Sequence, residues 1–306
     1  GPRRTAASIV SIVADRPRPR QGTAPVVIAS ARGDAAGPIV FRDQQPVSVP
    51  LWREGLFGLD WLALRASPVF YGIGVPRGDG SAVVLVPGFL GTDWYLLELY
   101  GWLGRLGYRP FLSRIGRNAE CLETLSRRLL ETAETAREAT RRPVHLVGHS
   151  LGGLLARSVA VRRPELVASV VTLGSPFRGI RSHPLVLRVS DRVRERLQRD
   201  DRPDCFTGHC DCPAVTGLES AFQSWVRQVA VYTNTDGIVD WRVCINDDPV
   251  TNVEVTGTHV ALVANPAVYR ALALHLAAVA AAGARRSAAP PSDAGSPPSS
   301  GCPSCG

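Results

Sequence analysis

The pentapeptide Gly148-His149-Ser150-Leu151-Gly152 combines a potential nucleophile with the glycines that a sharp turn needs. It follows an apolar segment, Val144 to Val147, and precedes a helical pattern that stops at Pro164. A strand-to-helix turn of this kind pushes the serine hydroxyl out over the edge of a sheet. The hydroxyl then lies at a helix N-terminus, whose partial positive charge favours a developing oxyanion. We therefore predict that Ser150 is a nucleophile rather than part of a structural glycine turn.

A serine hydroxyl needs a base to take its proton, and histidine is the usual one. Of six histidines, only His259 lies between a late strand pattern, Val253 to Thr256, and the last helical pattern. This position corresponds to the carboxyl edge of a parallel sheet, where Ser150 is also expected. We predict that His259 is the base. The others fall within a buried strand, the turn itself, an irregular region or the last helix: His145, His149, His183, His209 and His275.

The histidine in turn needs a carboxylate that orients it and stabilises its charged form. Asp236 follows the strand pattern Val229 to Thr233 and precedes a glycine, so its side chain can project over the sheet edge. Asp240, four residues further on, is the alternative. We favour Asp236, which gives the chain order serine, aspartate, histidine.

The negative charge that forms during attack on a carbonyl needs two backbone N–H donors. Leu151, directly after the nucleophile, can provide one, and Phe89 in the loop Pro87 to Gly91 can provide the second. We also predict that Phe89, Trp94 and Phe177 contact an apolar substrate.

The elements that position these residues alternate between apolar strands and amphipathic helices, which predicts an α/β fold with a mostly parallel sheet covered by helices on both faces. We expect an irregular N-terminal arm over residues 1–50, one domain over residues 51–282 and a flexible tail over residues 283–306. Residues 176–224 interrupt the alternation.

Composition excludes several functions. The chain carries 35 basic and 27 acidic residues, and all the basic ones are Arg, so lysine Schiff-base chemistry and a P-loop lysine are excluded. The arginines are scattered rather than gathered in a stripe interleaved with aromatic residues, so we expect no nucleic-acid partner. No apolar run reaches the ~18 residues of a membrane span, and we expect no transmembrane segment. We expect no cofactor and no metal, and a cytoplasmic location, or a secreted one if a signal has been removed.

The seven cysteines are too few for a disulfide scaffold in a chain of this length. Cys205, Cys210 and Cys212, with His209, form a cluster that could be a metal knuckle, a disulfide knot or unreacted thiols. The spacing is not a standard zinc pattern, and we favour a bridge from this cluster to Cys244.

Four motifs in the same order resemble those of bacterial lipases and esterases of the α/β-hydrolase fold: Val86-Pro87-Gly88-Phe89, Gly148 to Gly153, Thr235 to Val239 and Thr256-Gly257-Thr258-His259. The resemblance implies hydrolysis of carboxylic esters through an acyl-enzyme. Because this fold often carries an insertion at the position of residues 176–224, the resemblance also implies that these residues form a cap or lid. It also implies Ser150, Asp236 and His259 as the triad, with Phe89 and Leu151 as oxyanion donors. An acyltransferase or thioesterase would share these residues, and a non-catalytic protein of the same fold is a further alternative.

Overall fold

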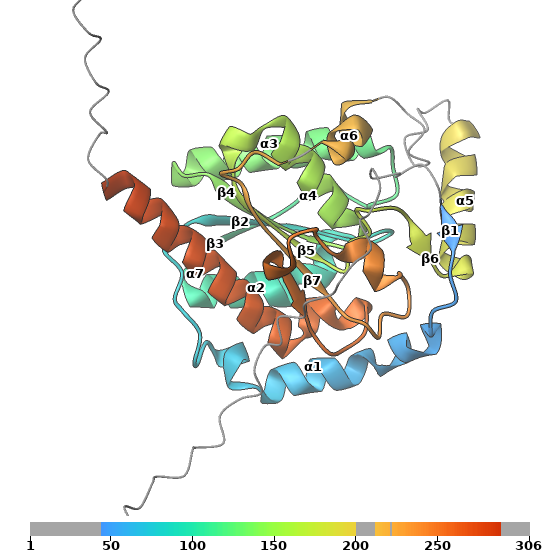
Figure 1. Ribbon diagram of the computed structural model, residues 1–306, viewed down its shortest axis with the longest axis horizontal. Helices are drawn as coiled ribbons and strands as arrows, with labels where there is room; N and C mark the ends of the chain where they lie inside the picture. Colours follow the sequence, from blue (N-terminus) through green and yellow to red (C-terminus); the bar gives the residue numbers. More distant parts are fainter. Residues whose placement is uncertain (1–43, 200–211, 221, 289–306) are drawn as a thin grey trace, which may run out of the picture.

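The computed structural model describes residues 44–199, 212–220 and 222–288 (Figure 1). Its strands are β1 (Gln45–Pro46), β2 (Ala82–Val86), β3 (Arg109–Leu112), β4 (Val144–His149), β5 (Val167–Leu173), β6 (Arg181–Ser182), β7 (Arg227–Tyr232) and β8 (Asn252–Glu254). Its α-helices are α1 (Phe57–Ala66), α2 (Leu97–Leu106), α3 (Leu122–Thr140), α4 (Leu151–Arg162), α5 (Pro184–Arg199), α6 (Pro213–Thr216) and α7 (Pro266–Ala288). The 3₁₀ helices are η1 (Leu51–Leu56), η2 (Pro68–Tyr71), η3 (Asp93–Leu96), η4 (Pro164–Leu166), η5 (Gly217–Glu219), η6 (Trp241–Cys244), η7 (Pro249–Thr251) and η8 (Val260–Ala264).

Within the described residues, six strands form one parallel sheet in the order β3-β2-β4-β5-β7-β8. Because every pair is parallel, all the carboxyl ends of the strands lie at one edge of the sheet. The loops after β2, β4, β7 and β8 therefore meet there, although they are far apart in the sequence.

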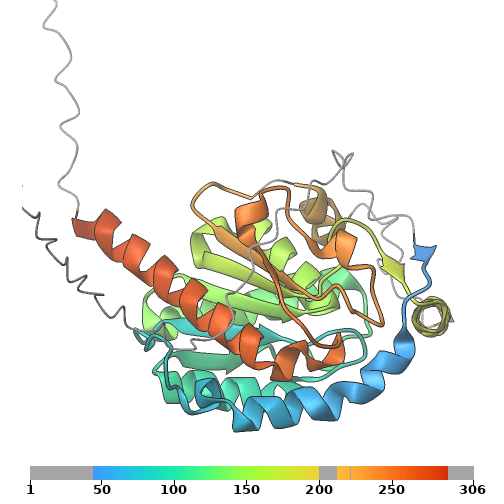
Figure 2. The ribbon, with the colours of Figure 1, turned by 60° about the horizontal axis from the view of Figure 1, so that its bottom comes forward.

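Both faces of the sheet are buried, and β2 shows how one apolar run serves both. Its alternate residues Ala82, Val84 and Val86 pack into the core beneath α3 and α4, whereas Val83 and Leu85 pack on the opposite side, with α2 and α7. Figure 2 shows the sheet between these two layers, with α1 along the outer side of the second layer. Both sets of side chains of such a strand are buried, so its sequence is apolar at nearly every position, and β2 and β4 do not alternate between apolar and polar residues.

Between β5 and β7 the chain leaves the sheet and forms β6, α5, α6 and η5. β6 pairs in parallel with β1, so the first described residues of the chain lie beside this insertion (Figure 1). The predicted arm lies outside the described residues up to residue 43. The predicted tail is partly wrong, because α7 continues to Ala288, and residues 289–306 lie outside the described residues.

Helix α7 is long and apolar enough, by length and composition, to span a membrane. Core helices pass the same test, and residues in the first half of α7, such as Tyr269 and Leu272, are buried against the sheet. The expectation that the chain has no transmembrane segment stays a prediction.

Candidate active site

Ser150 lies at the turn between β4 and α4 with φ 51° and ψ −124°, a conformation that L-residues rarely adopt. The flanking glycines are required by close backbone contacts. A Cβ on Gly148 would lie 2.4 Å from the carbonyl oxygen of Gly152, and one on Gly152 would lie 2.4 Å from that of Val86. The turn can therefore form only with glycine at both positions, and it presents Ser150 at the N-terminus of α4.

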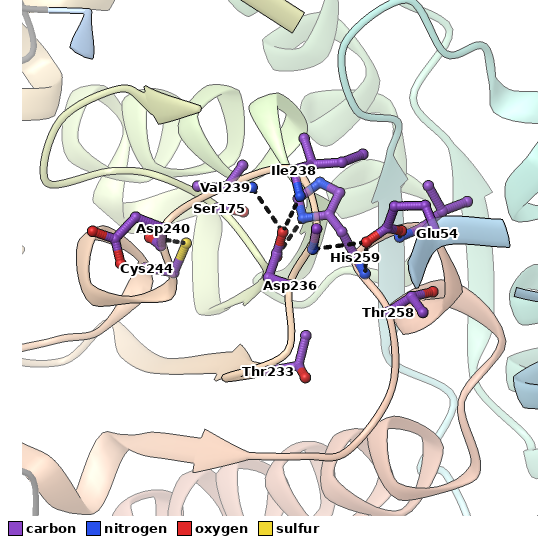
Figure 3. Close-up of polar contacts among 12 residues, drawn as sticks. Glu54, Ser175, Thr233, Asp236, Ile238, Val239, Asp240, Cys244, Thr258 and His259 are labelled. Carbon is purple, nitrogen blue, oxygen red and sulfur yellow. Dashed lines mark hydrogen bonds and ion pairs between the residues drawn. The ribbon is translucent and has the colours of Figure 1, made fainter. Parts of the chain in front are cut away.

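Asp236 and His259 are joined directly at the same edge of the sheet (Figure 3). Nδ1 of His259 lies 2.6 Å from Oδ2 of Asp236, and both side chains are buried. The other carboxylate oxygen accepts hydrogen bonds from the backbone N–H groups of Ile238 (2.8 Å) and Val239 (2.7 Å). These bonds fix the carboxylate, and the carboxylate fixes the imidazole so that Nδ1 is occupied and Nε2 is the nitrogen able to act as a base.

The rival carboxylate does not approach His259. Asp240 accepts a hydrogen bond from the backbone of Arg242 at the start of η6 and forms ion pairs with Arg242 and Arg181. It stabilises a surface turn, whereas Asp236 carries the contact with the histidine.

Opposing influences set the pKa of His259. Burial on its own lowers that pKa, but the charge of Asp236, its hydrogen bond to Nδ1 and the charge of Glu54 together raise it above the usual 6.5. The imidazolium that forms when His259 accepts a proton is thus stabilised by two nearby carboxylates.

The loop after β2 lies against the turn that carries Ser150, and both Phe89 and Leu151 line the same cavity as Ser150 and His259. Asn118 holds this loop: its side-chain amide donates to the carbonyl oxygen of Pro87 (2.7 Å), and its backbone carbonyl accepts from Leu90 (2.8 Å). Asn118 is fully buried and carried no recognisable signal in the sequence.

His149 connects three parts of the site. Its Nε2 donates to the carbonyl oxygen of His259 (3.0 Å), so its Nδ1 accepts from the hydroxyl of Tyr95 (3.0 Å), which in turn accepts from the backbone N–H of Gly88. Burial, with the nearby His259, lowers the pKa of His149 to about 3, so the ring is neutral. The turn that carries Ser150, the loop that carries His259 and the loop after β2 are therefore linked by one chain of hydrogen bonds.

The cavity beside Ser150 and His259 has a volume of about 430 Å³ and is largely apolar. Helix α5 of the insertion forms one wall with Leu185, Val186, Leu187 and Val189. Among the described residues that line the cavity, none carries a carboxylate or a guanidinium group. Its other lining residues are Gly88, Phe89, Leu90, Tyr95, His149, Leu151, Pro176, Ile180, Ser182, Ser190, Ile238, Val239 and Val260.

Two of the three predicted substrate contacts are not brought to this cavity. Trp94 is 78% exposed, and Phe177 is buried beneath the guanidinium of Arg157, 4.1 Å from it. Sequence proximity suggested both, but Trp94 points to solvent from η3 and Phe177 packs into the core beneath α4. Only Phe89 lines the cavity.

The predicted bridge to Cys244 is wrong, because Cys244 is a buried free thiol whose Sγ lies 3.8 Å from the carbonyl oxygen of Asp240. Burial raises the pKa of the Cys244 thiol well above its usual value, so the thiol stays protonated. Cys205, His209 and Cys210 lie outside the described residues. In the part of the chain that the structure does describe, no group of three or more His, Cys, Asp or Glu side chains is arranged to hold a metal ion.

Comparison with known proteins agrees with this architecture. Residues 126–201 match the family model described as the alpha/beta hydrolase fold. A stretch of 140 residues is 31% identical to a triacylglycerol lipase from Burkholderia plantarii, covering 40% of this chain and 37% of that protein. A stretch of 113 residues is 34% identical to a triacylglycerol lipase from Pseudarthrobacter phenanthrenivorans, covering 32% and 33%. The chain thus matches only about a third of the length of these relatives. The solved structure of Est1E from Butyrivibrio proteoclasticus is 14% identical with a TM-score of 0.44, covering 68% of this chain and 92% of that one.

The parallel sheet, the strained serine turn and the matched family model define the class: this chain has the α/β-hydrolase fold. Within that class it is similar to bacterial lipases and esterases, as its motifs indicated. The predicted fold class and the resemblance are both confirmed.

Proposed function

We propose that this protein hydrolyses carboxylic esters of apolar acyl groups through an acyl-enzyme formed on Ser150. The observation that carries the proposal is the Asp236–His259 pair, 2.6 Å apart, at the same apolar cavity that Ser150 lines. The similarity to triacylglycerol lipases supports ester chemistry.

In the proposed reaction, Nε2 of His259 takes the proton of Ser150 as Oγ attacks the ester carbonyl. Asp236 stabilises the imidazolium, and the N–H groups of Phe89 and Leu151 stabilise the oxyanion. His259 then gives its proton to the departing alkoxide, which leaves the acyl group on Ser150. Water, activated by the same histidine, releases the acid and restores the serine.

The cavity supports an uncharged, apolar acyl group. A carboxylate or ammonium group on the substrate would lose its hydration there without an opposite charge among the described lining residues. Leu90, Leu185 and Val260 line the cavity and are also exposed, so the apolar surface continues to solvent and an ester can enter.

Fluorophosphonate labelling tests the nucleophile. We expect the wild type to be labelled at Ser150 and folded Ser150→Ala to remain unlabelled; a folded wild type that resists labelling overturns the proposal. A panel of p-nitrophenyl acetate, butyrate and octanoate then tests the acyl class, and a clear preference for acetate contradicts the apolar acyl pocket. Adding an alcohol acceptor separates hydrolysis from acyl transfer.

A further inference from the structure

Glu54 lies in η1, before the first strand of the main sheet, yet its carboxylate contacts the loops that carry both Asp236 and His259 (Figure 3). Its Oε1 accepts from the backbone N–H groups of Gly237 (2.9 Å) and His259 (3.0 Å). Its Oε2 accepts from the backbone N–H of Val260 (2.9 Å). One side chain therefore ties together two loops that are more than 180 residues away from it in the sequence.

Gly237, directly after Asp236, leaves the space that this contact needs. A Cβ on Gly237 would lie 2.8 Å from Oε1 of Glu54 and 2.8 Å from the carbonyl oxygen of Pro50. The Asp236 loop can thus approach the carboxylate of Glu54 only because residue 237 has no side chain.

Glu54 is itself anchored to the body of the protein. It precedes α1, whose Leu64 is fully buried in the core and whose Asp60 accepts from the side-chain amide of Asn265 (3.3 Å). The same amide donates to the carbonyl oxygen of Thr256, before the histidine loop (2.7 Å). The segment η1–α1 therefore holds this loop at two points: Asp60 of α1 through Asn265, and Glu54 of η1 at the backbone of His259.

We propose that Glu54 is a positioning residue, which fixes the separation of Asp236 and His259 by binding the backbone of both loops and places a second negative charge near the imidazole. The proposal rests on the proposed ester hydrolysis for its kinetic consequences. With the carboxylate in place, the backbone N–H of His259 is held by Glu54, its carbonyl oxygen by His149 and its Nδ1 by Asp236. The ring therefore has little freedom to turn.

The charge of Glu54 has a consequence that a purely structural contact would lack. Three titratable side chains lie around His259: Asp236 in the loop after β7, Glu54 in η1 and the neutral His149 at the end of β4. In addition, Asp60 of α1 lies near the backbone of Thr258. Asp236 and Glu54 both raise the pKa of His259. Removing the charge of Glu54 should therefore move the acid limb of kcat/KM to lower pH.

The test compares Glu54→Gln, which keeps the size of the side chain and removes the charge, with Arg53→Gln as the matched control. Arg53 is the adjacent residue, and its guanidinium lies over the exposed ring of Trp52. In Glu54→Gln we expect kcat to fall ~10-fold or more, because small displacements of catalytic groups are costly. KM should change little, because Glu54 does not line the cavity. The acid limb should move to lower pH, while Arg53→Gln should behave as wild type.

An NMR titration of the His259 imidazole, assigned with His259→Asn, makes the test independent of turnover. A lower His259 pKa in Glu54→Gln than in wild type supports the proposal for Glu54 even if no ester is hydrolysed. The absence of ester hydrolysis would defeat only the proposed function. An unchanged kcat, or an unchanged His259 pKa in a Glu54→Gln variant that melts cooperatively, overturns it. A fall in kcat that Arg53→Gln reproduces also overturns it.

Discussion

Replacing Asp236 with asparagine gives the most direct test of the candidate triad. In the wild type, Oδ1 accepts from two backbone N–H groups and Oδ2 accepts from Nδ1 of His259. An amide has only one acceptor oxygen. If that oxygen keeps the two backbone bonds, the amide NH₂ faces Nδ1, which must then give up its hydrogen and become an acceptor.

The proton of the neutral imidazole would then sit on Nε2, which could no longer take the proton of Ser150. We therefore expect kcat to fall by about 10⁴-fold in Asp236→Asn. That loss corresponds to ~5 kcal/mol of transition-state free energy. The fold should survive, because the asparagine fills the same space and keeps the two backbone bonds.

The assay is kcat and KM on p-nitrophenyl butyrate for wild type, Asp236→Asn and Asp240→Asn, with thermal unfolding as the folding check. Asp240→Asn is the matched control, since it removes a carboxylate from the same loop. It should cost less than about threefold in kcat, because the ion pairs of Asp240 are with surface arginines. The assignment of the acid would be refuted if folded Asp236→Asn kept a tenth of the activity, or if Asp240→Asn were the worse variant.

Two further predictions concern the loop after β2 and the cavity wall formed by α5. Tyr95→Phe removes the hydroxyl between Gly88 and His149, and we expect a roughly 10-fold lower kcat with ~1–2 kcal/mol of lost stability, measured by urea unfolding; wild-type kcat in this variant would contradict the role given to the hydrogen-bonded chain. Val186→Trp fills the wall that α5 contributes, so the ratio of octanoate to butyrate hydrolysis should fall ~10-fold or more. Arg188→Trp, on the same helix but outside the cavity lining, is its control and should leave the ratio unchanged.

The sequence was sufficient for the parts of the site whose chemistry is local. The serine turn can be read from Gly148 and Gly152, because the backbone there approaches too closely for any Cβ. The loops that carry Asp236 and His259 could be placed because the carboxyl ends of parallel strands all lie at one edge of the sheet. A residue in the loop directly after such a strand is therefore expected at that edge.

The expected positions that the structure does not reproduce depended on side-chain direction. Phe177 and Trp94 are close to catalytic motifs in the chain, but one packs beneath Arg157 and the other faces solvent. One wall of the cavity is formed by α5, whose apolar residues could equally well have been assigned to a local core. Cys244 lies near Asp240 rather than in a bridge, which spacing could not reveal.

The sequence by itself determined the fold class and the order of the candidate serine, aspartate and histidine, because hydrophobic periodicity and glycine requirements are properties of short segments. Only the tertiary structure decided that Glu54 joins the Asp236 and His259 loops and that His149 joins the serine turn to the His259 loop. Those contacts are hydrogen bonds between a side chain and the backbone of distant segments. Backbone N–H groups are the same in nearly every residue, so such a partner leaves no mark in the sequence.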